Sequence, residues 1–227
     1  MSVRVGVVLF PGSNCELDVV EAVGMLGGSG EILWHGDSSL GDVDAVVIPG
    51  GFAHGDYLRP GAIARFSPIM DAVTDFARSG GPVVGICNGF QILTEAGLLP
   101  GALQKNAGLK FVCGPSLLRV ETDDTVLTNG IEPGTELVVP INHFEGNYAC
   151  SPEMLDELRA QDRVVFRYVD NPNGSVDDIA GICSEGRNVV GMMPHPERAM
   201  LEILGSVDGR RLFGSLLAVA GARTRAA

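Results

Sequence analysis

One short stretch constrains the fold of this chain more than any other: an apolar run, 82–86, that ends at a cysteine placed between two glycines. The run is β-branched and predicts a buried strand, and the apolar spacing of 90–99 predicts a helix directly after it. Gly85 and Gly89 stand two residues to either side of Cys87 and permit a sharp turn from strand to helix. Cys87 therefore occupies the position of a nucleophile elbow, with its thiol facing the positive end of the helix.

A cysteine at the end of an apolar strand is also compatible with a small buried hydrophobic residue. A catalytic base elsewhere in the sequence is therefore needed to identify Cys87 as a nucleophile. His195 and Glu197 follow the apolar run 189–193. Pro196 favours an extended His195, and residues two apart in an extended segment project to the same side. The alternative is a surface histidine in a proline turn. Together with the elbow, the pattern predicts Cys87 as nucleophile, His195 as base and Glu197 as the carboxylate that orients it.

Strand-like and helix-like patterns alternate along the first hundred residues. The predicted strands cover 3–10, 31–34, 43–48 and 82–86, and the predicted helices cover 17–26, 69–77 and 90–99. Ser13 and Glu16 have the spacing of a capping box that would start the first helix. Such alternation predicts a parallel sheet with helices on both faces. Because the carboxyl ends of parallel strands share one edge, we expect 49–52 to lie near Cys87.

The pattern changes after residue 101, where strand-like pieces follow one another between turns. These pieces cover 117–120, 136–141, 164–169, 179–183 and 188–193, and closing helices are predicted at 201–204 and 211–220. We expect the later strands to extend the sheet in antiparallel fashion. The whole chain, 1–227, is therefore predicted to form one α/β domain with a mixed, mostly parallel sheet.

Composition argues against several classes of function. Hydrophobic residues make up 45% of the chain and charged residues 19%, which suits a sizeable core. The formal net charge is −12 without a basic cluster, so we expect neither a nucleic-acid-binding nor a membrane-binding surface. The start of the chain enters a strand without a signal-peptide layout, and the five scattered cysteines suit free thiols. A cytoplasmic protein is therefore expected.

Metal and nucleotide motifs are not recognisable in the sequence. Four histidines are too dispersed for a metal-ligand spacing, so no metal is predicted: His35, His54, His143 and His195. The two lysines, Lys105 and Lys110, do not follow a glycine as the lysine of a P-loop does, so no phosphate cradle and no cofactor are expected in this chain. Cys15 is a rival nucleophile at the start of a predicted helix, but without a nearby histidine in sequence or a flanking glycine pair it is interpreted as structural.

The motifs 85–91 (GICNGFQ) and 194–198 (PHPER) resemble those of the class I, or triad, glutamine amidotransferases, in the chain order cysteine, histidine, glutamate. Longer stretches resemble one branch of that family, the glutaminase subunits of phosphoribosylformylglycinamidine synthases. They are 10–15 (FPGSNC), 49–52 (PGGF), 55–59 (GDYLR), 171–175 (NPNGS) and 191–198 (GMMPHPER). The resemblance runs from Val3 to the closing helix and implies a flavodoxin-like amidotransferase domain.

The resemblance implies a glutaminase that hydrolyses L-glutamine to glutamate and ammonia through a cysteine thioester. It places the oxyanion on the backbone N–H groups of Gly51 and Asn88, and substrate contacts at Gln91 and His143. The implied partners are an ATP-dependent synthetase subunit, which holds ATP and magnesium and converts formylglycinamide ribonucleotide to formylglycinamidine ribonucleotide in purine biosynthesis, and a small bridging subunit.

Three positions depart from the pattern that the resemblance suggests. His54 stands where tyrosine is expected, and Asn142 and Phe144 stand where small residues are expected around the predicted substrate contact. Three alternatives remain open at this point: a free-standing thiol hydrolase or peptidase of the same fold, a glutaminase for a different synthetase, and a scaffold or sensor domain that is no enzyme. High turnover by the isolated chain would favour the first of these.

Overall fold

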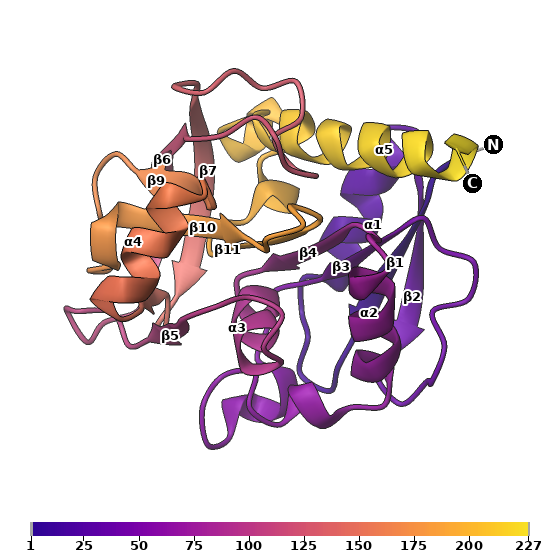
Figure 1. Ribbon diagram of the computed structural model, residues 1–227, viewed down its shortest axis with the longest axis horizontal. Helices are drawn as coiled ribbons and strands as arrows, with labels where there is room; N and C mark the ends of the chain where they lie inside the picture. The colour runs from indigo at the N-terminus through magenta and orange to yellow at the C-terminus, as the bar shows by residue number, and fades with distance from the viewer. Residues whose placement is uncertain (1, 227) are drawn as a thin grey trace.

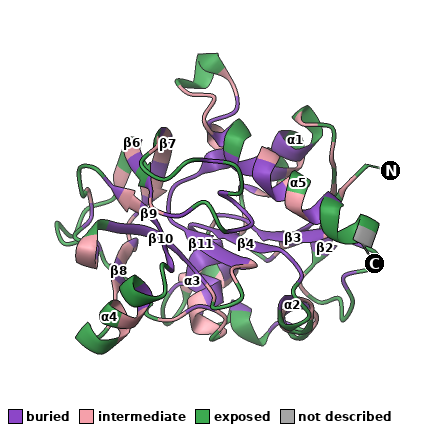
Figure 2. Cartoon of the chain, turned by 45° about the horizontal axis from the view of Figure 1, so that its top comes forward, coloured by how far each residue is buried: buried purple, intermediate pink, exposed green. Residues whose placement is uncertain are grey.

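The computed structural model describes residues 2–226, which contain a nine-stranded sheet with helices on both faces (Figure 1). The first half of the chain alternates strands and helices as predicted. Its strands are β1 (Arg4–Leu9), β2 (Ser29–Trp34), β3 (Ala45–Ile48) and β4 (Val83–Ile86), and its helices are α1 (Glu16–Met25), α2 (Ile69–Arg78) and α3 (Asn88–Glu95). Helices α1 and α5 (Gly209–Ala226) contact each other on one face, and α2 and α3 lie on the other (Figures 1 and 2).

The second half of the chain extends the sheet beyond β4. Its strands are β6 (Val112–Val120), β7 (Glu136–His143), β9 (Val164–Tyr168), β10 (Ile179–Cys183) and β11 (Val189–Met192). The strand order is β2-β1-β3-β4-β11-β10-β9-β6-β7. Its first four strands have the order of the flavodoxin-like sheet, and the antiparallel part confirms a mixed sheet.

The prediction that all the later strands are antiparallel is wrong for β11. This strand pairs with β4 in parallel, from Val189 beside Val83 to Met192 beside Ile86, and only its other edge is antiparallel, to β10. All four residues of β4 and of β11 are buried, as in a strand covered on both faces. The cysteine strand and the histidine strand are therefore direct neighbours at the centre of the sheet.

Several local predictions differ from the structure. Helix α1 begins without the predicted capping box, because the Ser13 hydroxyl accepts from the N–H of Phe10 and not from the helix. Residues 202–204 form a short 3-10 turn where an α-helix was expected. Two strands and one α-helix were not predicted from the sequence: the small antiparallel pair β5 (Ala102–Gln104) and β8 (Asn147–Ala149), and helix α4 (Pro152–Ala160), whose Ser151 side chain caps its N-terminus. Among the residues described, no helix combines the length and apolar character needed to cross a bilayer.

Close packing joins α3 to the middle of the sheet. A Cβ atom on Gly89 would lie 1.9 Å from the carbonyl oxygen of Ile48, and one on Gly85 would lie 2.6 Å from the carbonyl oxygen of Gly89. Backbone atoms occupy both positions, so neither contact can be relieved by a side-chain rotation. These two glycines therefore let α3 start directly against β3 and β4.

We expect Gly89→Ala to lower the free energy of unfolding by about 3 kcal/mol, because α3 must shift away from Ile48. Gly214→Ala is a matched control, since a Cβ at this position in α5 meets nothing within 4 Å. That control should raise stability by about 0.5–1 kcal/mol through its better helix propensity. Urea unfolding measures both changes. Equal stability of Gly89→Ala and the unmodified chain would contradict the close approach of α3 to β3.

Candidate active site

Residues that follow the carboxyl ends of four parallel strands line one cavity. A hollow of about 180 Å³ lies beyond β1, β3, β4 and β11, where sites gather in sheets of this kind. Cys15 follows β1, Gly51 follows β3, Cys87 follows β4 and His195 follows β11, and all four line the cavity. The expected proximity of 49–52 to Cys87 is thus confirmed, because Gly51 and Phe52 line the cavity together with Cys87.

Cys87 has the backbone conformation of a nucleophile elbow. Its φ of 51° and ψ of −104° are uncommon for any residue other than glycine and hold the side chain above the turn into α3. Its N–H donates to the carbonyl oxygen of Met192 at 2.8 Å, which fixes the turn to the end of β11. The thiol lies 3.8 Å from the carbonyl oxygen of Asn142 and lines the cavity.

His195 and Glu197 form a buried pair. Nδ1 of His195 lies 2.6 Å from Oε1 of Glu197, and both side chains are at most 2% exposed. The expectation of neighbouring side chains is confirmed, although Glu197 lies in a 3-10 turn (Pro196–Arg198) and not in an extended segment. Burial alone would lower the pKa of His195, but the charges of Glu197 and Cys87 outweigh it and hold that pKa well above its usual value.

The second ring nitrogen of His195 is left available for chemistry. Nε2 is buried and has no hydrogen-bond partner within residues 2–226. Because Glu197 engages Nδ1, the ring presents Nε2 as its remaining polar atom. The thiol of Cys87 is among the groups that raise the pKa of His195, so the two side chains interact electrostatically in this site. This geometry suits a histidine that exchanges a proton with a neighbouring thiol or a leaving group.

Of the predicted oxyanion donors, Asn88 directly follows Cys87 in the chain and Gly51 lines the same cavity as its thiol. Asn88 is the first residue of α3, so its N–H has no partner within the helix. Gly51 has a φ of +150°, and a Cβ there would lie 2.7 Å from Cα of Ser13, so only glycine fits at this position. The side chain of Asn88 is already engaged, because its oxygen accepts from the N–H of Ala53 at 2.9 Å. Its backbone N–H is the donor that remains.

The two predicted substrate contacts, Gln91 and His143, both line the cavity, and each is also engaged in a hydrogen bond within the protein. The Gln91 carboxamide donates to the carbonyl oxygen of Glu145 at 2.5 Å and accepts from Asn88 at 2.8 Å. Nδ1 of His143 lies 3.1 Å from Oδ1 of Asn106. Burial, with a smaller effect of His195, lowers the pKa of His143 to about 4, so its ring is neutral at pH 7.

The departures from the family pattern lie at different places around the site. The His54 ring packs edge-on against His35, with ring centroids 5.1 Å apart, and does not line the cavity. Asn142 and Phe144 do line it. The substitution at His54 therefore changes packing outside the cavity, whereas the other two change its wall.

Cys15 lies closer to the histidine than the sequence indicated. Its sulfur is 4.0 Å from Nδ1 of His195 and accepts from the Arg198 guanidinium at 3.1 Å. Cys15, His195 and Glu197 offer three ligand atoms within 4.8 Å of one another, the kind of donor set that a metal such as zinc binds. Nδ1 of His195 and Oε1 of Glu197, however, are already bonded to each other at 2.6 Å. We therefore interpret the trio as a hydrogen-bonded pair beside a structural thiol.

Sequence reasoning missed one cavity residue with a distinctive environment, Asp56. Its backbone is held at a φ of 52°, and its neighbours His54 and Gly55 are also at positive φ. Burial is the largest influence on this carboxyl and raises its pKa to about 6; the hydrogen bond from Asn88 opposes the rise and the charge of Glu145 adds to it. The stretch GDYLR stood out only as a family motif, because no chemical pattern in the sequence marks Asp56.

We expect Asp56→Asn to stabilise the protein at neutral pH. The pKa of Asp56 is raised on folding, so the folded state binds more protons than the unfolded state between about pH 4 and pH 6, and stability falls as pH rises through that window. After allowance for partial exposure, the variant should gain about 1 kcal/mol at pH 7.5, or about 2–4 °C in Tm. The gain should vanish at pH 4. Thermal unfolding at pH 7.5 and pH 4 measures the change in Tm, and the exposed Asp123→Asn is the control. An equal gain in Tm at both pH values would contradict the raised pKa of Asp56.

Comparison with known proteins identifies the family of this chain. The family of CobB/CobQ-like glutamine amidotransferase domains matches residues 2–211. The chain is 58% identical to the phosphoribosylformylglycinamidine synthase subunit PurQ of Rubrobacter xylanophilus, over 95% of this chain and 98% of that one. It is 56% identical to the subunit of the same name from Koribacter versatilis, over 94% of this chain and 97% of that one.

A solved structure is similar over the same extent. A chain in the structure of PurLQS from Thermotoga maritima is 43% identical and superposes with a TM-score of 0.89, covering 96% of this chain and 99% of that one. The matched residues include the cysteine elbow, the histidine–glutamate pair and the whole parallel part of the sheet. The chain therefore belongs to the family of CobB/CobQ-like glutamine amidotransferase domains.

Proposed function

We propose that this chain is the glutaminase subunit of a phosphoribosylformylglycinamidine synthase. One observation carries the proposal: a strained cysteine and a histidine that is bonded to a buried glutamate line the same cavity, in a chain more than half identical to such subunits over 94% or more of its length. The reaction is the hydrolysis of the L-glutamine carboxamide to glutamate and ammonia.

The site geometry supports a two-step acyl transfer. The thiolate of Cys87 attacks the carboxamide carbon, and the N–H groups of Gly51 and Asn88 bind the negative charge that develops on the carbonyl oxygen. His195, held by Glu197, gives a proton to the nitrogen as the carbon–nitrogen bond breaks, so ammonia leaves and a glutamyl thioester remains. His195 then takes a proton from water, which attacks the thioester and releases glutamate and the thiol.

Ammonia is useful to a synthetase only if it arrives unprotonated, so a partner must cover the site. We propose that the partners are the synthetase subunit and a small bridging subunit of the complex, as the similarity to the PurLQS chain suggests. ATP and magnesium then belong to the synthetase subunit, which uses the ammonia to convert formylglycinamide ribonucleotide to formylglycinamidine ribonucleotide. A cytoplasmic location is also proposed, since all five cysteines are free thiols.

We expect Cys87→Ala to abolish the glutamine-dependent amination of formylglycinamide ribonucleotide by the reconstituted complex with ATP, because the variant lacks the thiol that forms the thioester in the proposed mechanism. Ammonium salt should support the same amination with either chain, since it bypasses the glutaminase. Product formation with glutamine and with ammonium measures both. If the unmodified chain fails with glutamine while ammonium works, the partner assignment is wrong. High glutaminase turnover by the isolated chain would instead favour a free-standing hydrolase.

We expect Glu197→Gln to lower kcat for glutamine-dependent amination by about 1,000-fold, because an amide that donates to Nδ1 of His195 reverses the tautomer that the site requires. The exposed Glu202→Gln is the matched control and should leave kcat unchanged. Co-elution of each variant with the synthetase and bridging subunits in size-exclusion chromatography reports whether the complexes assemble. An unchanged kcat in Glu197→Gln would exclude Glu197 as the orienting carboxylate.

A further inference from the structure

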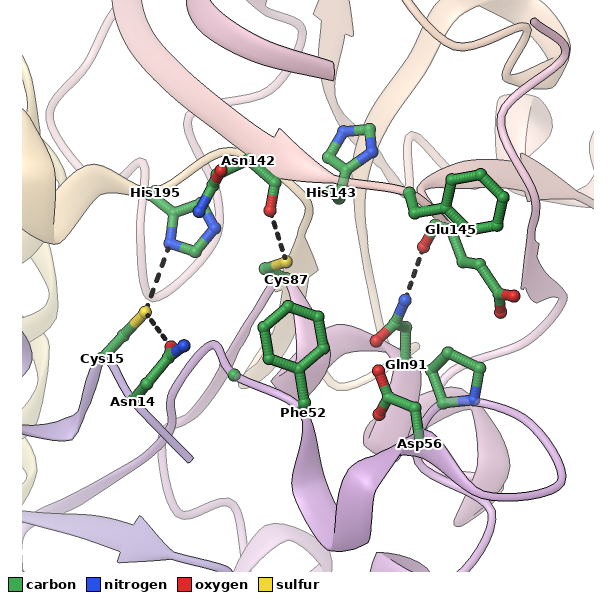
Figure 3. A pocket seen from close by; sticks show the side chains of 13 residues that line it. Asn14, Cys15, Phe52, Asp56, Cys87, Gln91, Asn142, His143, Glu145 and His195 are labelled. Atoms are coloured by element: carbon green, nitrogen blue, oxygen red, sulfur yellow. Dashed lines mark hydrogen bonds between the residues drawn. The ribbon is translucent and has the colours of Figure 1, made fainter. Parts of the chain in front are cut away.

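The cavity has two ends of different character. Cys15 and His195 lie at one end, and Asp56, Gln91 and Glu145 gather at the other, with the thiol of Cys87 between them (Figure 3). The proposed chemistry uses only the first end and the thiol. It gives no reason for the acidic side chains at the second end.

Asp56 is built into the second end of the cavity. Its Oδ1 accepts from the side-chain amide of Asn88 at 3.1 Å, and that amide also donates to Gln91 at 2.8 Å. Asn88 directly follows the thiol-bearing Cys87, so the carboxylate is tied to the residue next to the nucleophile. Arg59, at the end of the same loop, makes two bonds to Glu95 of α3, at 2.5 and 2.7 Å, and fastens the loop to the helix.

No cationic side chain of residues 2–226 forms an ion pair with the acidic end. Neither Asp56 nor Glu145 takes part in an ion pair among the residues that the structure describes. The nearby arginines Arg59 and Arg65 both pair with Glu95, and Lys105 lies 6.0 Å from the ring centre of Phe144. The site therefore holds partly buried carboxyl groups at the end of a cavity without supplying the positive charge that would compensate them.

Glutamine carries a matching charge at the end remote from its carboxamide. Its α-amino group is an ammonium at neutral pH, and it is separated from the reacting carbon by the length of the side chain. On the basis of the proposed function, we propose that Asp56, assisted by Glu145, binds the α-ammonium group of the substrate. Asp56 thereby selects amino acids with a free α-amino group. Gln91 has a positioning role, since its carboxamide joins Asn88 to the backbone of Glu145.

If Asp56 binds the α-ammonium group, its replacement should weaken the hydrolysis of substrates that carry this group and spare those that lack it. Glutaramate is glutamine without the α-amino group, so it keeps the reacting carboxamide and lacks the group that Asp56 binds. We expect Asp56→Asn in the reconstituted complex to lower kcat/KM for glutamine by about 10- to 100-fold, mainly through KM, since a charge-assisted hydrogen bond is lost. The same variant should change kcat/KM for glutaramate by less than about 3-fold, because that substrate never made the bond.

Ammonia release from both substrates is measured for the unmodified complex, Asp56→Asn and the exposed control Asp123→Asn, and the control should match the unmodified complex. An equal loss of kcat/KM with glutamine and with glutaramate would overturn the proposal, since it would show that Asp56 has a structural role. Failure of the unmodified complex to hydrolyse glutamine would instead overturn the proposed function.

Co-elution of each variant with the synthetase and bridging subunits in size-exclusion chromatography checks that each complex is assembled. If Asp56→Asn does not assemble, Glu145→Gln carries the same test. We expect that variant to lower kcat/KM by about 3- to 10-fold for glutamine alone, because Glu145 has the assisting role. A loss of kcat/KM of the same size for glutamine and glutaramate in Glu145→Gln would likewise overturn the proposal.

Discussion

The backbone of Cys87 is the constraint on which the rest of the site depends. A φ of 51° with a ψ of −104° costs about 1–3 kcal/mol for a residue with a side chain, so the surrounding structure must hold it. Three interactions do so: the burial of all of β4, the bond from the Cys87 N–H to Met192, and the close approach of Gly89 to Ile48. The bond to Met192 also extends the pairing of β4 with β11, which brings His195 to the thiol.

The sequence was most informative where local geometry determines the chemistry. The glycines around Cys87 predicted the elbow, and Pro196 predicted neighbouring side chains for His195 and Glu197, because both arguments involve only residues close together in the chain. The parallel pairing of β11 was missed, since periodicity reports burial and not strand direction. The position of Cys15 beside His195 was missed for the same kind of reason: 180 residues separate the two, and only the sheet brings them together.

Asp56 shows the limit of local reasoning more clearly. Its loop contains several residues at positive φ, and hydrogen bonds to Asn88 and Glu95 of α3 direct it toward the cavity. Propensity argues against such a backbone for residues other than glycine, so no sequence pattern predicts it. Strain of this kind occurs where the surrounding structure fixes a functional group, which is consistent with a carboxylate held for a ligand.

The two ends of the cavity together explain how one small substrate can be bound in a single direction. The histidine end has a carboxylate of its own, but Glu197 is fully buried and bonded to His195, so it offers little to an entering ammonium. Asp56 and Glu145 lack such a partner, and the attraction of opposite charges is strongest where water is partly excluded. An ammonium group at that end leaves the neutral carboxamide as the part of glutamine that faces Cys87. The charge arrangement therefore presents the reactive carbon to the thiol before any bond is formed.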